Sequence, residues 1–383
     1  MNTTTLVLNY INNRHTREDQ RFFILSQLER SLLTLWTALP KTVLELRLGS
    51  VARRLRIELL ISGNDSLKDT ESFLELMRSN LEEYHWSIVP TQAFQASNVL
   101  AVRRKTVSIP LEVGQFGDSF SDVSLWCPGN FVSINANWKG VIAHLQRLGQ
   151  DTMLSVRFQP TVISSEEHEF LARSLSCCQQ VLRKDDAVLA ARAKVWFQHL
   201  ENWAGGLQRG VALVSIILAS NQTISPMTAQ LIGSMFASGE RKDLALYSGF
   251  EIQALEPDEE SLICTKLHDA QALPAITVFV PEAPVDAGRL PYLLDSTEAA
   301  SVFLLPPITL EAIPGLEYRH HLELDVQSSF STPTSGEDKS VQLGMNRVGH
   351  KTQTVYLSKT DLRRHQYVIG QTGTGKKIGR AHV

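Results

Sequence analysis

The sequence has little of the features that mark several specialised protein classes. It holds four cysteines in 383 residues, two of them adjacent, and so offers neither a disulfide framework nor the spacing of a metal site. Its longest apolar run, residues 211–219, is far shorter than the roughly 20 residues of a membrane-spanning helix. The first residues lack the positive flank and apolar run of a secretory signal. We therefore expect a cytoplasmic protein with no transmembrane segment.

An excess of one sign of charge is also missing. Lysine and arginine number 37 against 40 acidic residues, which leaves a net charge of -3. This balance excludes a globally basic surface for nucleic acid, although a local basic stripe remains open. Hydrophobic residues make up 43% of the chain and charged residues 20%, so a wholly disordered chain is excluded. The length predicts about two or three domains.

Helical and strand periods alternate along the chain. Apolar residues at helical spacing predict helices over residues 17–39, 66–85, 139–149, 165–203 and 226–236. Alternating or continuous apolar runs predict strands over residues 43–48, 54–61, 99–104, 107–113, 153–158, 211–219 and 276–280. Gly49-Ser50 separate the first two strands. Ser164, with Glu167 three residues later, matches a capping box that opens the helical stretch starting at 165, and Gly205-Gly206 close that stretch.

These elements predict an α+β or mixed α/β fold in more than one domain. We expect an N-terminal α+β domain over residues 1–150 and a second α/β domain over residues 151–326. Residues 327–340 (QSSFSTPTSGEDKS) are polar and rich in small residues, which indicates a linker. The start of a further domain is expected over residues 341–376.

A phosphate-loop pattern follows the linker. The segment 353–358 (QTVYLS) alternates as a strand, and the short apolar run 367–369 leads into the sequence GQTGTGK. These are the first seven positions of G-x-x-x-x-G-K-[S/T], in which glycines let backbone N–H groups approach phosphates and the lysine contacts the β- and γ-phosphates. A glycine-rich hairpin turn is the alternative. The predicted nucleotide-binding residues are Gly370, Gln371, Thr372, Gly373, Thr374, Gly375 and Lys376.

The eighth position of this pattern should be Ser or Thr, whose hydroxyl binds Mg²⁺, but here it is Lys377. The chain then ends as KIGRAHV. One back-translation, AAG ATC GGA AGA GCA CAC GTC, resembles after its first base a widely used short-read sequencing adapter. We therefore expect residues 377–383 to be translated adapter sequence and the gene to be cut within the motif; a natural C-terminal tail is the alternative.

The residues LRRHQYVIGQTGTGK, 362–376, resemble the entry to the motor domain of the HerA/FtsK superfamily. The resemblance is closest to HerA-like ATP-binding proteins and the ATPases of conjugative type IV secretion. Gly344, Asn346, Arg364 and His365 match the small β-rich element that precedes the loop in that family. The segment 290–307 (LPYLLDSTEAASVFLLPP) resembles the family's segment before the motor. Within it, Asp295 is expected to cap a helix that Pro306-Pro307 end.

The resemblance implies a RecA-like P-loop domain that binds ATP and Mg²⁺ in the full-length parent. It also implies a homo-oligomeric, hexameric ring that moves DNA or drives a substrate through a secretion channel, in the cytoplasm or at the membrane periphery. The family's Walker B carboxylate and arginine finger would follow residue 376, so we expect this chain to be an N-terminal fragment without hydrolysis. The alternatives are an interaction or scaffold module of a conjugation, secretion or defence complex, and another P-loop class such as ABC or AAA proteins.

Four smaller clusters each have a structural and a functional interpretation. They are Cys177-Cys178, Glu166 with Glu167 and Glu169, His320-His321, and the basic residues Arg53, Arg54, Arg56, Arg103, Arg104 and Lys105. We expect buried thiols, a helix start that favours acidic residues, a solvent-facing histidine, and a solvated basic strand edge. The functional alternatives are a redox pair, a catalytic carboxylate pair, a metal site and a DNA-contacting stripe. Trp196 and Trp203 are expected on one core-facing side of a helix.

Overall fold

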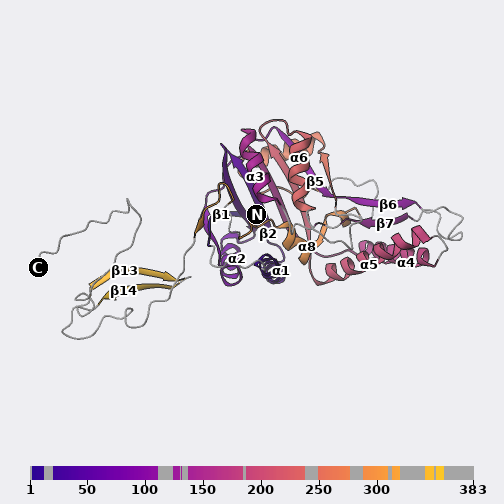
Figure 1. The fold of residues 1–383 in the computed structure, drawn as a ribbon, viewed down its shortest axis with the longest axis horizontal. Coiled ribbons are helices and arrows are strands. Elements are labelled where there is room, and N and C mark those ends of the chain that lie inside the picture. The colour runs from indigo at the N-terminus through magenta and orange to yellow at the C-terminus, as the bar shows by residue number, and fades with distance from the viewer. Residues whose placement is uncertain are drawn as a thin grey trace, which may run out of the picture. The chain divides into compact units, whose positions relative to one another are not determined.

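A computed structural model shows a mixed α/β chain (Figure 1). It describes residues 2–12, 20–110, 124–129, 131, 137–183, 187–237, 249–276, 288–308, 313–319, 341–348 and 351–357. The chain divides into two compact units, Met1–His320 and His321–Val383. The predicted linker 327–340, the strand 367–369, the phosphate loop 370–376 and the tail 377–383 lie outside the described residues.

One sheet of ten strands runs through the described part of the first unit. Its main path is β10 (Phe250–Ala254), β5 (Asn98–Arg104), β9 (Val211–Ser220), β8 (Thr152–Thr161), β2 (Val43–Val51), β3 (Arg54–Gly63), β1 (Asn2–Asn12) and β12 (Tyr318–Arg319). Off this path, β11 (Leu293–Asp295) pairs with β9, and β4 (Tyr84–Val89) pairs with β1. All pairs are antiparallel except that of β1 with β12.

The sheet joins segments that the sequence assigns to two domains. β8 starts just after the expected boundary at residue 150, yet it pairs with β2 on one side and with β9 on the other. β9 in turn pairs with β5. The two domains predicted over 1–150 and 151–326 are therefore wrong, because strands from both ranges alternate in one sheet. Strand periodicity shows which face of a strand is buried but not which strand lies beside it.

One face of the sheet lies on the main apolar core. Its helices are α1 (Gln20–Ala38), α2 (Ser66–Asn80), α3 (Trp138–Leu148), α6 (Pro226–Gly233) and α8 (Ser296–Val302). On β2, the alternating residues Leu44, Leu46 and Leu48 belong to this core, as the period of two predicts. Asp65, Asn137, Ser225 and Asp295 cap four of these helices by accepting backbone N–H bonds.

The opposite face is covered in part by α7 (Pro257–His268). Ile263 and Leu267 of α7 form an apolar cluster with Val99, Met153 and Ile217 of the sheet. Because apolar layers lie on both faces, every residue of β9 is buried. This explains why the predicted strand 211–219 is a continuous apolar run rather than an alternating one.

Two hairpins extend together away from the sheet, one of strands and one of helices, and we call them the arm (Figure 1). The arm consists of β6 (Thr106–Pro110), β7 (Ser124–Pro128), α4 (Ser165–Leu182) and α5 (Ala187–Arg209). An apolar cluster distinct from the main core, shared with Val211 and Leu213 of β9, contains Trp196, Trp203, Cys177 and Cys178, which confirms that these four residues are buried. α4 starts with the capping box of Ser164 and Glu167 that the sequence predicts.

Gly205-Gly206 do not close the helical stretch, because α5 continues through them to Arg209. A Cβ atom on Gly206 would lie 2.1 Å from Oδ2 of Asp295. The missing side chain thus admits the carboxylate of Asp295 against the helix, and this tertiary contact is why glycine stands inside it.

One further expectation differs from the structure, one strand is not among those expected, and two expected strands are described only in part. β1 was not among the predicted strands, and the helix expected over 66–85 ends at Asn80 because Tyr84 starts β4, which pairs with β1. The strand expected over 107–113 is β6 as far as Pro110, and its last three residues lie outside the described ones. Of the strand expected over 276–280, only Ile276 is described, and it has no regular structure.

The described part of the second unit is an antiparallel hairpin of β13 (Val341–Val348) and β14 (Lys351–Leu357). β14 covers most of the predicted strand 353–358. The pairing shifts register between Gln342 and Gly344, which is typical of a bulge. None of the helices in the described ranges is both long enough and apolar enough to cross a bilayer.

The turn between β2 and β3 holds two non-glycine residues in the left-handed region. Gly49 and Ser50 lie inside β2, and the two-residue turn is Ala52, with φ 49°, and Arg53, with φ 63°. Two-residue hairpin turns of this kind favour Asn and Gly, because a Cβ at positive φ costs about 1–2 kcal/mol. The backbone N–H of Ala52 donates to Oδ1 of Asp151 at 2.8 Å.

Ala52→Asn is expected to raise the free energy of unfolding by about 1 kcal/mol, because Asn tolerates this conformation and the bond to Asp151 uses only the backbone. Urea denaturation followed by circular dichroism measures the change. Ala191→Asn, on an exposed position of α5, is the matched control and should lower stability by a few tenths of a kcal/mol. A lower stability for Ala52→Asn would contradict the argument from turn strain.

Candidate functional site

Most residues of the predicted nucleotide site lie outside the described part of the chain. This holds for residues 370–376 and for Arg364 and His365. Gly344 and Asn346 lie on β13, and Asn346 pairs with Gln353 of β14. Across the described ranges, no group of three or more His, Cys, Asp or Glu side chains is arranged to hold a metal ion. The chemistry that the structure does describe is concentrated in buried charged side chains of the first unit.

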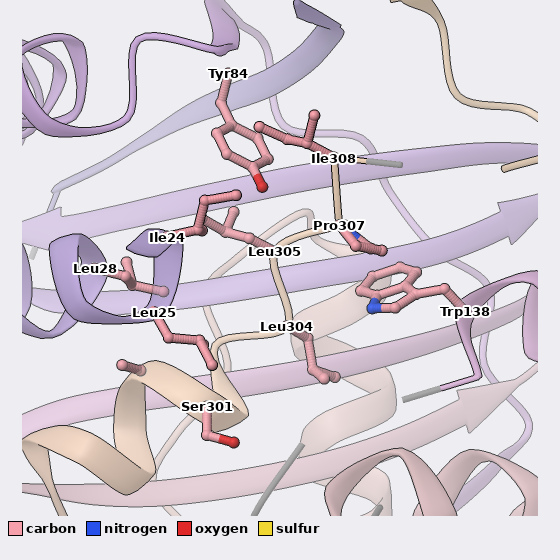
Figure 2. A pocket seen from close by; sticks show the side chains of 11 residues that line it. Ile24, Leu25, Leu28, Tyr84, Trp138, Ser301, Leu304, Leu305, Pro307 and Ile308 are labelled. Atoms are coloured by element: carbon pink, nitrogen blue, oxygen red, sulfur yellow. The ribbon is translucent and has the colours of Figure 1, made fainter. Parts of the chain in front are cut away.

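A small apolar pocket lies between α1, α8 and the segment that follows α8 (Figure 2). Ile24, Leu28, Trp138 and Leu305 line it, and Oη of Tyr84 donates a hydrogen bond of 2.7 Å to the carbonyl of Pro306 beside it. Its cavity volume is about 40 Å³, which is close to the space of one water molecule. The pocket is therefore too small for a nucleotide.

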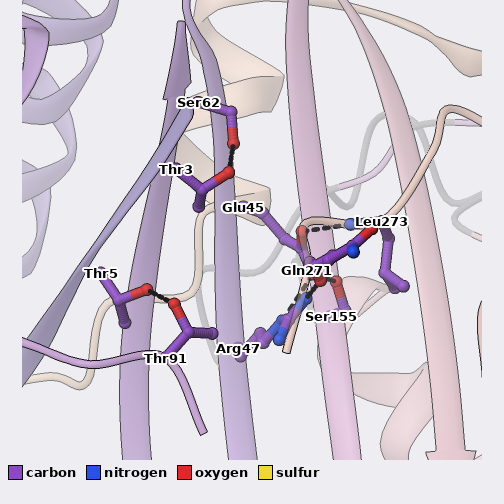
Figure 3. Close-up of polar contacts among 9 residues, drawn as sticks. All are labelled: Thr3, Thr5, Glu45, Arg47, Ser62, Thr91, Ser155, Gln271 and Leu273. Atoms are coloured by element: carbon purple, nitrogen blue, oxygen red, sulfur yellow. Dashed lines mark hydrogen bonds and ion pairs between the residues drawn. The ribbon is translucent and has the colours of Figure 1, made fainter. Parts of the chain in front are cut away.

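Glu45 of β2 is the centre of a buried polar cluster on the sheet face opposite the main core (Figure 3). Its Oε1 accepts hydrogen bonds from Nε of Arg47 at 2.6 Å and from Oγ of Ser155 at 2.8 Å. Its Oε2 accepts the backbone N–H of Leu273 at 2.7 Å, while Nη2 of Arg47 donates to the carbonyl of Gln271 at 2.6 Å. One carboxylate thus ties the segment 271–273 to strands β2 and β8.

Two more buried arginines lie on this face. Arg157 is opposite Glu45 in the register of β2 and β8, and its Nη2 donates to Oε1 of Gln159 at 3.0 Å. Burial lowers the pKa of Arg157, although Glu45 opposes this shift. Arg103 forms an ion pair of 2.5 Å with Glu251 of β10. Among the described residues, no acceptor contacts Nε or Nη1 of either arginine.

Arg104 points to the other face of the sheet and is fully buried. Its Nη2 lies 2.6 Å from Oε2 of Glu298 in α8 and also donates to the carbonyl of Leu293 at 3.3 Å. Its guanidinium lies 5.1 Å from the ring of Trp203 and 5.7 Å from the ring of Phe131. The backbone N–H of Phe131 donates to Oε1 of Glu298 at 3.2 Å.

Glu298 carries the clearest perturbation among these groups. Burial raises the pKa of Glu298 to about 7, and the nearby Asp295 adds to the rise. The positive charge of Arg104 and the N–H of Phe131 oppose it. Glu298 belongs to the segment 290–307, which resembles the HerA/FtsK family's segment before the motor. In this structure its carboxyl group forms an ion pair with Arg104 of the sheet.

The basic residues do not form one stripe. Arg103 and Arg104 are buried in ion pairs, so for them both a DNA-contacting stripe and a solvated strand edge are wrong. Arg53 and Arg54 are exposed at the β2–β3 turn. The burial of Arg104 could not be predicted from the sequence, because its partner Glu298 is 194 residues away.

The acidic residues at the start of α4 have a structural role through Glu167. Besides closing the capping box, Glu167 forms an ion pair of 2.8 Å with Arg289. His320 and His321 lie outside the described residues. The interpretation of Glu167 as part of a helix start is thus supported by its contacts, whereas the histidine prediction has no described counterpart.

The four thiols are expected to differ sharply in reactivity. Burial raises the pKa of all four thiols, to about 12 for Cys178, but Cys127, Cys177 and Cys178 are buried whereas Cys264 on α7 is only half-buried. In the native protein, Ellman's reagent should therefore label Cys264 first, and the other three thiols only after unfolding in urea. Cys264→Ser is the control and should abolish the early reaction; early labelling of a second thiol would contradict the buried arm core.

Glu45→Gln is expected to destabilise the protein by about 3 kcal/mol, because it removes the charge that compensates the buried Arg47 and Arg157. Urea denaturation gives the change in the free energy of unfolding. Glu71→Gln, on the exposed side of α2, is the matched control and should change stability by less than about 0.5 kcal/mol. A loss below 1 kcal/mol at Glu45 would show that the cluster around it contributes little.

Comparison with known proteins leaves the family open. No protein-family model matches the chain, and no curated protein matches it. The resemblance to the HerA/FtsK superfamily therefore rests on the sequence alone, on residues 290–307 and 362–376 with Gly344 and Asn346.

Proposed function

We propose that the chain is the N-terminal part of an ATP-binding motor protein of the HerA/FtsK type. The observation that carries this proposal is the spacing of residues 370–376 directly after the apolar run 367–369. In P-loop proteins a buried strand enters a glycine-rich loop in this order, because the loop must present successive backbone N–H groups to the phosphates. The hairpin of β13 and β14 supports the proposal, since the family has a small β-rich element before its loop.

In this proposal each loop residue has a defined task. The backbone of Gly370, Gly373 and Gly375 shapes the loop around the phosphates, and the ammonium of Lys376 contacts the β- and γ-phosphates of ATP. Lys377 stands where the motif needs a hydroxyl, and a lysine ammonium is no ligand for Mg²⁺. The sequence as given thus lacks that Mg²⁺ ligand, and we expect it to hydrolyse no ATP.

The same proposal extends to partners. A motor of this type works as a hexameric ring on DNA or on a secreted substrate, in the cytoplasm or at the membrane periphery. The first unit would then select the partner and support ring assembly. The second candidate function is an interaction or scaffold module without nucleotide chemistry. The arm favours it, because Leu182 at the end of α4 and Val188 at the start of α5 are exposed at 37% and 76%.

The source DNA beyond codon 376 tests the proposal most directly. We expect Ser or Thr at position 377, then a helix pattern and a later strand that ends in acidic residues. The protein expressed from that longer sequence should bind a fluorescent ATP analogue, and Lys376→Ala should weaken binding at least tenfold.

Lys351→Ala, at the start of β14, is the matched control and should leave nucleotide binding unchanged. A gene that ends naturally at codon 383, or binding that survives Lys376→Ala, would overturn the motor proposal. The first outcome would favour the interaction module.

A further inference from the structure

The arm meets the sheet at the buried pair of Arg104 and Glu298. Arg104 is the last residue of β5, and β6 of the arm starts two residues later at Thr106. Phe131, which donates its N–H to Glu298, follows the end of β7. Trp203 of α5 lies against the guanidinium of Arg104. The strand hairpin and the helical hairpin of the arm therefore both contact this pair, beside the apolar cluster in which Val211 and Leu213 of β9 pack against the arm.

The buried charges at this point do not balance. Arg104, Glu298 and Asp295 are 0%, 9% and 8% exposed, so two buried carboxyl groups accompany one buried guanidinium. Asp295 caps α8 by accepting the N–H of Glu298 at 2.8 Å, and its carboxylate lies against Gly206 of α5. An excess negative charge in a buried cluster costs free energy, and protonation of one carboxyl group removes that cost.

Charged and titratable groups on the neighbouring elements do not remove this excess. From α1, Oε1 of Glu29 accepts hydrogen bonds from the hydroxyls of Ser296 at 3.0 Å and Thr297 at 2.9 Å, which brings a third carboxylate to the start of α8. From α5, His199 bonds the carbonyl of Pro128 at 2.9 Å at the end of β7. His199 is thus a further titratable group near the arm's base, and the buried thiol of Cys127 on β7, whose pKa burial raises, adds no charge beside Arg104.

We propose that Arg104, Glu298 and Asp295 form a proton-dependent clasp that holds the arm to the sheet and loosens as the pH rises. At low pH the protonated Glu298 leaves the cluster neutral and the contacts to Phe131 and Trp203 closed. At high pH the ionised Glu298 adds a buried negative charge, and local opening gives that charge access to water. The inference is independent of the motor proposal, because it rests only on described residues of the first unit.

The difference in proton binding between the closed and open states determines whether the clasp opens or closes as the pH rises. In the closed state burial raises the pKa of Glu298 to about 7 from its ordinary value of 4.5. When the clasp opens, the carboxyl group meets water and its pKa falls back, so the closed state binds more protons between these two values. The equilibrium constant for opening therefore increases as the pH rises from about 5 to 7 and changes little above that range.

Hydrogen exchange of the whole protein, followed by mass spectrometry, tests the clasp at pH 5.5, 6.5, 7.5 and 8.5. After correction for the intrinsic exchange rate, protection of peptides that cover 124–131 should fall about 20-fold between pH 5.5 and 7.5, and less than about twofold from 7.5 to 8.5. Peptides from the centre of β8 should show no such fall. A flat profile at 124–131 in the unmodified protein would overturn the proposal.

Three variants identify the residue that causes the pH dependence of hydrogen exchange at residues 124–131. Glu298→Gln should make protection at 124–131 independent of pH, and Asp295→Asn should move the fall to lower pH by removing a neighbouring negative charge. The latter keeps the proposal testable should Glu298→Gln fail to fold. His199→Gln should leave the profile unchanged; loss of the pH dependence in this variant alone would assign it to the histidine and overturn the clasp.

Discussion

Burial of β9 on both faces is the constraint on which the rest of the first unit depends. All ten of its residues are buried, so its backbone polar groups need partners along the strand, and β5, β8 and β11 supply them. The neighbouring strands β5 and β8, and β2 beyond β8, also hold mostly buried residues, and a charged side chain on them must bring its own partner. This requirement explains why Glu45, Arg47, Arg103 and Arg104 all occur in ion pairs or polar networks.

These buried pairs do more to determine which segments of the chain contact one another than to raise the net free energy of unfolding. The desolvation cost of two buried charges offsets much of their attraction, whereas a partner left alone is strongly destabilising. Each pair therefore penalises arrangements in which its segments fail to meet. Glu45 requires the backbone N–H of Leu273, and Arg104 requires Glu298 and the carbonyl of Leu293. The segment 271–273, which has no regular structure, and the helix α8 are in this way fixed on the sheet.

The sequence predicted features whose causes are local. The capping box of Ser164 and Glu167 starts α4, and the helical spacing of Trp196 and Trp203 identified a core-facing side. It could not predict features whose causes are distant. The sequence places Arg104 in a basic run expected at a solvated strand edge, because its partner is 194 residues away. It predicts a helix end at Gly206, because the contact that needs this glycine comes from Asp295. The boundary at residue 150 failed for the same reason, since strand pairing is not visible in strand periodicity.

The same distinction separates the two kinds of chemistry in this chain. A phosphate loop acts through backbone N–H groups of consecutive residues, so its glycine and lysine spacing can be recognised over seven positions without knowledge of the rest of the fold. The cluster of Arg104, Glu298 and Asp295 acts through side chains that only tertiary structure brings together. Its excess negative charge is a property of the assembled sheet and arm, because each residue taken alone on a strand or helix would be an ordinary exposed charge. A sequence motif can therefore suggest what the second unit binds, whereas the response of the first unit to pH can be inferred only from its packing.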